Sequence, residues 1–236
     1  MFQTPAPRLI AHRGYTADAP ENSLMAFQAA GKAGYWAIET DVHLTADGEL
    51  VCNHDTTVDS MYDGSGYIRN MPLNSLCRLN FRKEFCPESR MPTFTEYLEI
   101  CKQYHAVPFI ESKCDAIPQI LETAFRFFSE DEIILSSTSF EHLKKARTLS
   151  DQVFIHHIFS DMKTIEQLSA LSNSGTSLNF PNPDDLPKGL ITTVHSKEVR
   201  LCLRAGDTPE AVQRMMSLGL DYIPTNKMLP DDFPAD

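Results

Sequence analysis

Acidic side chains and two histidines gather in the segment ETDVHLTADGELVCNHD, which covers residues 39–55. Glu39 and Asp41 stand at positions i and i+2 of its apolar first half, and His54 closes its second half. Side chains at i and i+2 of a β-strand share a face, so a strand here would project both carboxylates together. Neighbouring carboxylates repel each other until a proton or a cation neutralises them. The segment therefore predicts a cation site.

Two other apolar runs end in ionisable residues. The run VPFIES is followed by Lys113 and itself contains Glu111, while His12 and Arg13 come directly after RLIA. Hard oxygen ligands of this kind, without a zinc-like spacing of Cys or His, favour Mg²⁺ or Ca²⁺. We therefore expect one divalent cation, Mg²⁺ or Ca²⁺, with the ligands Glu39, Asp41 and Glu111.

Each of these side chains also has a purely structural interpretation. An E-x-D pair is most often a solvated edge, and a lone His12 is more often a hydrogen-bonded core residue than a catalyst. The pair His54-Asp55 could form a turn, or Asp55 could orient His54. Arg13 and Lys113 could pair with neighbouring acids, which would at the same time position them for an anion.

The chain positions these residues through apolar, strand-like runs that alternate with amphipathic helical segments. The expected strands are 8–12, 36–42, 107–112, 132–137, 153–158, 176–180, 199–205 and 220–225. The expected helices are 21–34, 93–105, 116–129, 139–150, 161–172 and 208–219. This alternation predicts an α/β fold, a (β/α)₈ TIM barrel, in which the carboxyl ends of the strands meet around one site. An open doubly wound sheet is the competing fold, but no Gly-x-Gly-x-x-Gly follows a strand.

One long segment interrupts the alternation of strands and helices between strands two and three. We expect a single domain over 1–236 with an inserted excursion at about 55–92, and excursions of this length are usually functional loops. A hairpin at 45–54, turning at Asp47-Gly48, would bring His54 back to the mouth of the barrel. Glu49 is expected to be solvated.

The composition of the chain excludes some classes of partner and predicts a cellular location. The formal net charge is −11 and no Lys/Arg run is present, so we expect no nucleic acid partner. No apolar run approaches the roughly 20 residues of a membrane helix, and the start lacks a secretory pattern, so we expect no membrane insertion and a cytoplasmic location. The six cysteines lack metal-like spacing and are expected to be reduced. The oligomeric state stays open.

The order of these motifs resembles the glycerophosphodiester phosphodiesterase family. The resemblance rests on HRG at 12–14, PEN at 20–22, ETDVHLTADG at 39–48, HD at 54–55 and ESK at 111–113. Further matches are DGSGYIRNMPLNSL, MPTFTEYLEI and SSTSFEHLKKAR. The resemblance runs in order from residue 9 to about 150 and more weakly beyond, and as a set these motifs are highly specific.

The resemblance implies a metal-dependent barrel enzyme. Its substrates would be glycerophosphodiesters such as glycerophosphocholine or glycerophosphoethanolamine, and its products glycerol 3-phosphate and an alcohol. In this family the glycerol 2-hydroxyl attacks phosphorus and water opens the resulting cyclic phosphate. The implied roles are metal ligands for Glu39, Asp41 and Glu111, acid/base catalysis for His12 and His54, and phosphate contacts for Arg13 and Lys113.

The chain departs from the family pattern near its end. The family's W-T-V-N on the seventh strand is replaced by LRAGD at 203–207, where Arg204 could contact substrate and favour a more negative headgroup. A usual Thr-Asp reads Thr225-Asn226. Two alternative functions remain: a related barrel phospholipase D acting on lysophospholipid or sphingolipid, and a non-catalytic binding barrel.

Overall fold

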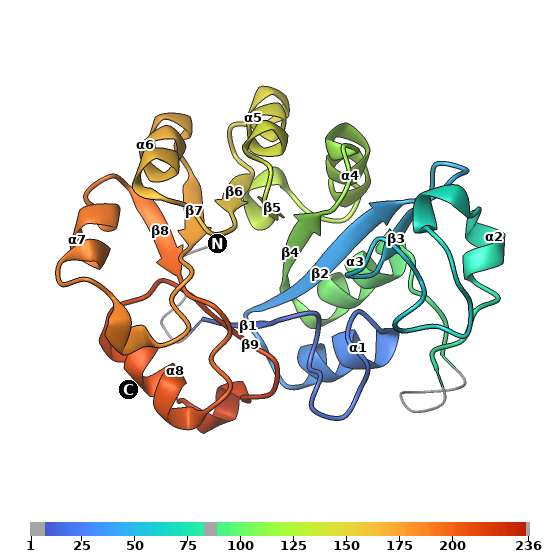
Figure 1. The fold of residues 1–236 in the computed structure, drawn as a ribbon, viewed down its shortest axis with the longest axis horizontal. Helices are drawn as coiled ribbons and strands as arrows, with labels where there is room; N and C mark the ends of the chain where they lie inside the picture. The colour runs from blue at the N-terminus through green and yellow to red at the C-terminus, as the bar shows by residue number, and fades with distance from the viewer. Residues whose placement is uncertain (1–7, 83–88, 235–236) are drawn as a thin grey trace.

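The computed structural model describes residues 8–82 and 89–234, and its centre is a nearly closed barrel of eight parallel strands with helices outside (Figure 1). The strands are β1 (Leu9–Ala11), β2 (Ala37–Leu44), β4 (Val107–Ser112), β5 (Ile134–Ser137), β6 (Phe154–His157), β7 (Ser174–Ser177), β8 (Val199–Cys202) and β9 (Ile223–Thr225). Their order in the sheet is β8-β7-β6-β5-β4-β2-β1-β9. The predicted TIM barrel is confirmed.

The seam between β8 and β9 is bridged by single hydrogen bonds instead of a strand ladder. The backbone N–H of Asp221 donates to the carbonyl oxygen of Leu201 at 2.9 Å. On the same seam, the N–H of Gly206 donates to the oxygen of Pro224 at 2.8 Å. The barrel therefore closes without a continuous ladder at this point.

All eight expected strands are present, but the sixth of them, β7, begins earlier than expected. β7 reads SGTS, and Ser174 and Gly175 lack the apolar pattern by which we placed the strand at 176–180. Gly175 is needed there because a Cβ atom at this position would meet the hydroxyl of Tyr222 and the ring of Phe154. Packing across the barrel interior, and not strand propensity, therefore requires glycine at position 175.

The helices cover the outside of the barrel and match the six expected ones. They are α1 (Leu24–Lys32), α3 (Phe94–Tyr104), α4 (Ile117–Ala124), α5 (Phe140–Leu149), α6 (Met162–Leu171) and α8 (Pro209–Ser217). A capping box begins α3, because the N–H of Glu96 donates to Thr93 Oγ1 and the N–H of Thr93 donates to Glu96 Oε2. A further helix, α7 (Leu190–His195), was not expected, since six residues are too few to show a helical period.

The barrel interior is filled with apolar side chains below the mouth. This inner cluster consists of Ile10, Ala37, Phe109, Ile134, Phe154, Cys202 and Tyr222. A larger cluster lies between the strands and the surrounding helices and includes Phe27, Tyr97 and Ile110. With its interior plugged in this way, the barrel leaves room for a site only at its end.

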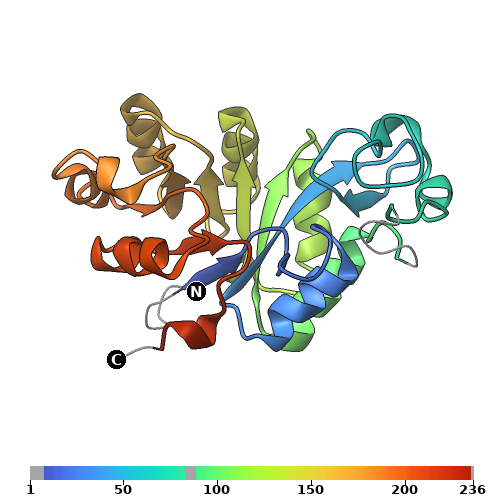
Figure 2. The ribbon, with the colours of Figure 1, turned by 60° about the horizontal axis from the view of Figure 1, so that its bottom comes forward.

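The expected hairpin is confirmed by β3 (Leu50–Cys52), which pairs antiparallel with β2 and places Val42 opposite Cys52. The chain then forms the short helices η1 (Ile68–Asn70) and α2 (Leu73–Leu76), close to the end of β2 (Figure 2). This segment has its own apolar cluster of Val51, Val58, Tyr62, Ile68, Leu76, Phe81 and Met91. That the segment is an insertion stays a prediction, and its residues 83–88, with Cys86, lie outside the described residues. The other five cysteines are free thiols.

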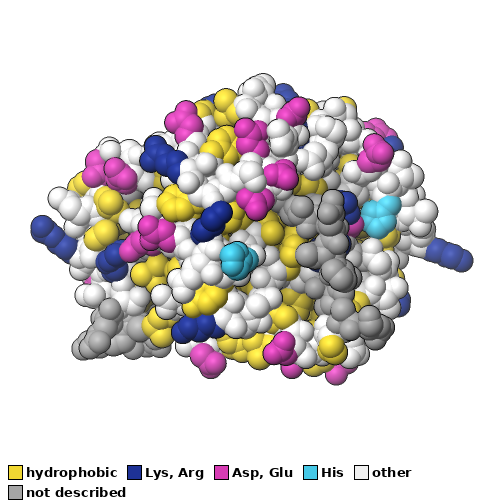
Figure 3. All heavy atoms as spheres, turned by 180° about the vertical axis from the view of Figure 1, so that it is seen from behind, with side chains coloured by type: hydrophobic (Ala, Val, Ile, Leu, Met, Phe, Trp, Pro, Cys, Tyr) yellow, Lys and Arg dark blue, Asp and Glu magenta, His cyan; other side chains and the backbone are white. Residues whose placement is uncertain are grey.

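Acidic and basic side chains are mixed on the face of the molecule drawn in Figure 3, and neither sign of charge forms a patch there. Within residues 8–82 and 89–234, no helix has both the length and the apolar character needed to cross a membrane.

A buried histidine in the inner wall predicts a loss of stability in acid. His156 Nδ1 is 2.6 Å from the Tyr222 hydroxyl, and burial lowers the pKa of His156 to about 3. The unfolded chain takes up this proton below about pH 6.5 and the folded chain does not, so stability falls as the pH drops from 6.5 towards 3. We expect this group to remove about 2 kcal/mol of stability by pH 5.

Urea unfolding at pH 7, 6 and 5 measures this effect. In a His156→Gln variant the free energy of unfolding should fall less steeply with decreasing pH, because unfolding takes up about one proton fewer. His105 is exposed, and the His105→Asn variant should show the same slope as the wild type. Equal slopes in wild type and His156→Gln would contradict the prediction.

Candidate active site

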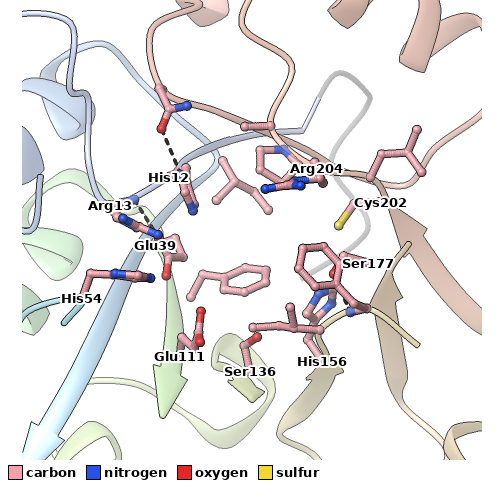
Figure 4. Close-up of a pocket in the computed structure, with 18 of the residues that line it drawn as sticks. His12, Arg13, Glu39, His54, Glu111, Ser136, His156, Ser177, Cys202 and Arg204 are labelled. Atoms are coloured by element: carbon pink, nitrogen blue, oxygen red, sulfur yellow. Dashed lines mark hydrogen bonds between the residues drawn. The ribbon is translucent and has the colours of Figure 1, made fainter. Parts of the chain in front are cut away.

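A cavity of about 670 Å³ lies at the end of the barrel where the strands finish (Figure 4). Seven of the eight predicted site residues line this cavity: His12, Arg13, Glu39, His54, Glu111, Lys113 and Arg204. The eighth, Asp41, is fully buried and contacts Lys113 and Arg13. The structure therefore brings the predicted residues together, from sequence positions almost two hundred residues apart.

The three carboxylates form one compact group. Glu39, Asp41 and Glu111 each offer an oxygen atom, and these atoms lie within 4.8 Å of one another. Glu39 and Asp41 share a face of β2, and the parallel register places Asp41 beside Glu111 of β4. We expected the pair at the end of the second strand, whereas β2 continues to Leu44 because its last residues pair with β3.

Electrostatics shows that this group is short of positive charge. Burial, and then the charges of Asp41 and Glu111, raise the pKa of Glu39 well above its usual value. Burial and Asp41 also raise the pKa of Glu111, although Lys113 opposes this. For Asp41, burial is outweighed by Lys113 and Arg13, which together lower its pKa. Carboxylate oxygens that repel each other in a buried place suit a hard divalent cation, so the cluster could hold a metal ion.

Asn22 holds one of these carboxylates, and we did not assign it a role from sequence. Its Nδ2 donates to Asp41 Oδ2 at 2.8 Å, and its Oδ1 accepts from Thr40 Oγ1 at 2.7 Å. Asn22 has a φ of +50°, a conformation that Asn tolerates better than most residues. Its position in the PEN motif just before α1 was the signal that could have found it.

The backbone and side chain of Arg13 both take part in the site. Its N–H donates to Glu39 Oε2 at 2.7 Å, and its guanidinium pairs with Glu21 at 2.9 Å. Lys113 Nζ pairs with Asp41 at 3.0 Å and contacts Glu111. Both basic side chains are therefore held by acids, as one sequence interpretation allowed.

A chain of hydrogen bonds defines the protonation of His12. Asn226 Nδ2 donates to the carboxylate of Asp207 at 2.6 Å, so Asn226 Oδ1 must be the atom that lies 2.9 Å from His12 Nδ1. Since Oδ1 can only accept, His12 carries its proton on Nδ1, and Nε2 keeps a lone pair. Burial, and then Arg13, lower the pKa of His12. Sequence analysis noted Asn226 but missed this orienting role, and its position after the last strand was the available signal.

His54 comes from the turn after β3 and has a different partner. Its Nδ1 lies 2.9 Å from Asp55 Oδ1, and Asp55 also accepts a hydrogen bond from Ser60 at 2.6 Å. The hydrogen bonds from Ser60 and His54 lower the pKa of Asp55, so this carboxylate is ionised and accepts from Nδ1–H. The expected orienting contact is present, and Figure 4 shows the rings of His12 and His54 both directed at the space beside Glu39.

Known proteins resemble this chain in sequence. Residues 12–229 match the model of the Glycerophosphoryl diester phosphodiesterase family. A glycerophosphodiester phosphodiesterase of Caldanaerobacter subterraneus subsp. tengcongensis is 28% identical over 228 residues, which are 92% of this chain and 93% of that protein. Glycerophosphodiester phosphodiesterase 1 of Mus musculus is 39% identical over 110 residues, which cover 44% of this chain and 33% of the mouse protein.

Solved structures resemble this one in fold. A phosphodiesterase of Oleispira antarctica, solved in complex with the product sn-glycerol-3-phosphate, aligns with a TM-score of 0.84 at 24% identity and covers 93% of each chain. A glycerophosphodiester phosphodiesterase of Agrobacterium tumefaciens aligns with a TM-score of 0.81 at 24% identity, covering 98% of this chain and all of that chain. Both likenesses support the barrel fold.

Proposed function

Because this chain belongs to the glycerophosphoryl diester phosphodiesterase family, and is thus a phosphodiester hydrolase, we propose that it converts glycerophosphodiesters to glycerol 3-phosphate and an alcohol by metal-dependent acid/base catalysis. The observation that carries this proposal is the placement of three carboxylates, with oxygen atoms within 4.8 Å of one another, beside two histidines in one cavity.

We assign the metal to the carboxylate cluster. Glu39, Asp41 and Glu111 would hold one divalent cation, Mg²⁺ or Ca²⁺, because their oxygens are hard ligands whose mutual repulsion needs a cation. When bound, such an ion polarises a phosphoryl oxygen and stabilises the charge that develops on the phosphate.

Arg13 and Lys113 are the phosphate contacts in this proposal. Both line the cavity beside the carboxylates, and both keep a positive charge, because nearby acids raise the pKa of each against the effect of burial. Their pairing with Glu21, Asp41 and Glu111 fixes their positions before substrate arrives. Preorganised cations of this kind need little rearrangement during the reaction.

The hydrogen bonds of the two histidines suggest which one acts as base first. His12 is neutral at pH 7 because its pKa is lowered, and its free Nε2 can only accept a proton. It would remove the proton of the attacking hydroxyl, the glycerol 2-hydroxyl in this family. His54 would then donate a proton to the leaving alcohol oxygen while Asp55 holds its Nδ1–H. In the second step His54 would accept a proton from water, and His12 would return one to the glycerol oxygen.

The remaining predictions from sequence are part of this proposal. We infer a small-molecule substrate, without nucleic acid or membrane insertion, a cytoplasmic location, and one domain over 1–236 with an insertion at about 55–92. The oligomeric state stays open.

A substrate panel tests the proposed function. Wild-type protein incubated with glycerophosphodiesters of different alcohols should release glycerol 3-phosphate in the presence of Mg²⁺ or Ca²⁺. An excess of chelator should remove this activity, and added cation should restore it, because the carboxylates alone repel a phosphate. A coupled assay for glycerol 3-phosphate measures both results.

Three outcomes would contradict the proposal. Full activity in chelator would remove the metal from the mechanism. Saturable binding without turnover of any member would favour a binding barrel, whereas turnover of lysophospholipid or sphingomyelin alone would favour the phospholipase D alternative.

A further inference from the structure

The cavity has a second wall that the proposed chemistry does not use. The carboxylates and His54 occupy the side formed by β2, β3 and β4, whereas Phe159 and Arg204 come from the segments after β6 and β8. Figure 4 shows Arg204 across the cavity from Glu111 and His54. A substrate bound at the carboxylates would therefore extend towards Arg204.

Arg204 differs from the other cavity cations in having no acidic partner. Arg13 pairs with Glu21, and Lys113 pairs with Asp41, whereas the guanidinium of Arg204 forms no ion pair with any Asp or Glu in the described part of the chain. Asp207 also lines this wall, but its carboxylate accepts hydrogen bonds from Asn226 and Thr225. The five N–H groups of Arg204 are thus available to a ligand.

Phe159 holds Arg204 in this place. The centre of the guanidinium lies 5.6 Å from the centroid of the Phe159 ring, in cation–π range. Phe159 is 46% exposed and has a φ of +60°, a strained conformation for an aromatic residue, and its N–H donates to Ser177 Oγ at 3.1 Å. Strain of this kind persists where the surroundings enforce it, often at ligand sites. The ring attracts the cation without using any of its N–H donors, which stay free to bind a ligand.

An unpaired guanidinium fixed on an aromatic ring suits a planar or multidentate anion. Glycerol offers only hydroxyl groups, and the reacting phosphate belongs with Arg13, Lys113 and the carboxylate cluster on the other wall. An anion at Arg204 must therefore be carried by the alcohol. The net charge of −11 would repel such a substrate, so this local cation is what would admit it.

We propose that Arg204, positioned by Phe159, binds an anionic group on the alcohol, so that the preferred substrates are glycerophosphodiesters whose alcohol carries a carboxylate or a phosphate. This inference rests on the proposed function of the same cavity.

The test compares substrates that differ by a single anionic group. Glycerophosphoserine and glycerophosphoethanolamine differ by one carboxylate, and glycerophosphoinositol with and without a ring phosphate differ by one phosphate. Wild type should favour the anionic member of at least one pair by about tenfold in kcat/KM, the usual effect of one charge-assisted hydrogen-bonded contact. The pair that shows the preference identifies the anion.

Variants then locate the preference. Arg204→Met should bring the ratio of kcat/KM within that pair close to one, and Arg204→Lys should restore part of it. Arg126→Met is the control. It removes an equal charge from an exposed position in the turn just after α4 and should keep the wild-type ratio of kcat/KM. Phe159→Leu should raise KM for the anionic member more than it lowers kcat, and Phe159→Trp, which keeps an aromatic face, should restore the low KM.

The outcomes separate the two levels of the proposal. Turnover by wild type without a preference for either anionic member would overturn the inference and leave the proposed function standing. An equal loss for both members in Arg204→Met would also overturn it, because Arg204 would then contact the reacting phosphate. Failure of wild type to hydrolyse any member would remove the proposed function and this inference with it.

Discussion

Replacing Glu39 by Gln is expected to lower kcat for glycerophosphodiester hydrolysis by a factor on the order of a thousand. Gln keeps the size of the side chain, and its amide oxygen can still accept the hydrogen bond from the N–H of Arg13. What is lost is one negative charge from a group of three carboxylates whose oxygens lie within 4.8 Å. Stopped assays of glycerol 3-phosphate release at saturating cation measure the loss.

The same variant has an expected effect on stability of opposite sign. Burial and the neighbouring carboxylates raise the pKa of Glu39, so Glu39 destabilises the metal-free fold increasingly as the pH rises from the ordinary Glu value towards the raised pKa, and the penalty is absent below the ordinary value. Glu39→Gln should therefore be at least as stable as wild type in chelator. Added Mg²⁺ or Ca²⁺ should raise the Tm of wild type and should have little effect on the variant.

A matched control comes from the same acidic segment. Glu49 is exposed in the hairpin turn, and Glu49→Gln removes an equal charge without touching the cluster. Its activity should stay within about twofold of wild type, as expected for a surface substitution. Wild-type kcat in Glu39→Gln, or an equal loss in both variants, would rule out the assigned role of Glu39.

Replacing His12 by Asn should lower kcat by about a hundredfold to ten-thousandfold, the usual contribution of a general base. Asn cannot accept the proton that His12 Nε2 is placed to receive. The fold should survive, because His12 is only partly buried and its one side-chain partner in the described structure is Asn226. The measurement is kcat with a good and a poor leaving alcohol, since loss of the base should slow both.

The pH profile distinguishes a catalytic His12 from a structural one. Asn226→Asp would place a carboxylate at 2.9 Å from His12 Nδ1 and favour the imidazolium, so the acid limb of kcat/KM should move to higher pH. The exposed His105 supplies the control, because His105→Asn removes a histidine outside the cavity and should leave the profile unchanged. An unchanged acid limb in Asn226→Asp would assign that limb to another group.

Much of the fold could be predicted because its signals are local. Apolar runs and helical periods located eight strands and six helices, since each pattern records which face of an element is buried. The two misses have different causes. α7 is too short to show a helical period. The start of β7 was missed because Gly175 is required by contact with the Tyr222 hydroxyl, which comes from a residue just before β9, far along the chain.

The acidic segment at 39–55 shows where sequence reasoning stops. Spacing placed Glu39 and Asp41 on one face, and the barrel rule brought Glu111 beside them, because strand alternation and parallel register are properties of the backbone. Asp47 and Glu49 could be excluded as metal ligands from sequence alone, because they belong to the hairpin turn and not to the strand.

The partners of the charged groups depended on the tertiary structure. The hydrogen-bond chain from Asp207 through Asn226 to His12 joins residues from opposite ends of the sequence, and it alone defines which nitrogen of His12 is free. The cation–π contact of Arg204 with Phe159, and its lack of an acidic partner in the described part of the chain, likewise follow from the approach of two loops. Sequence determined which residues reach the barrel mouth, because strand geometry is local. Tertiary structure decided their protonation and pairing, because these depend on atoms a few ångströms away in space and on the loss of water around them.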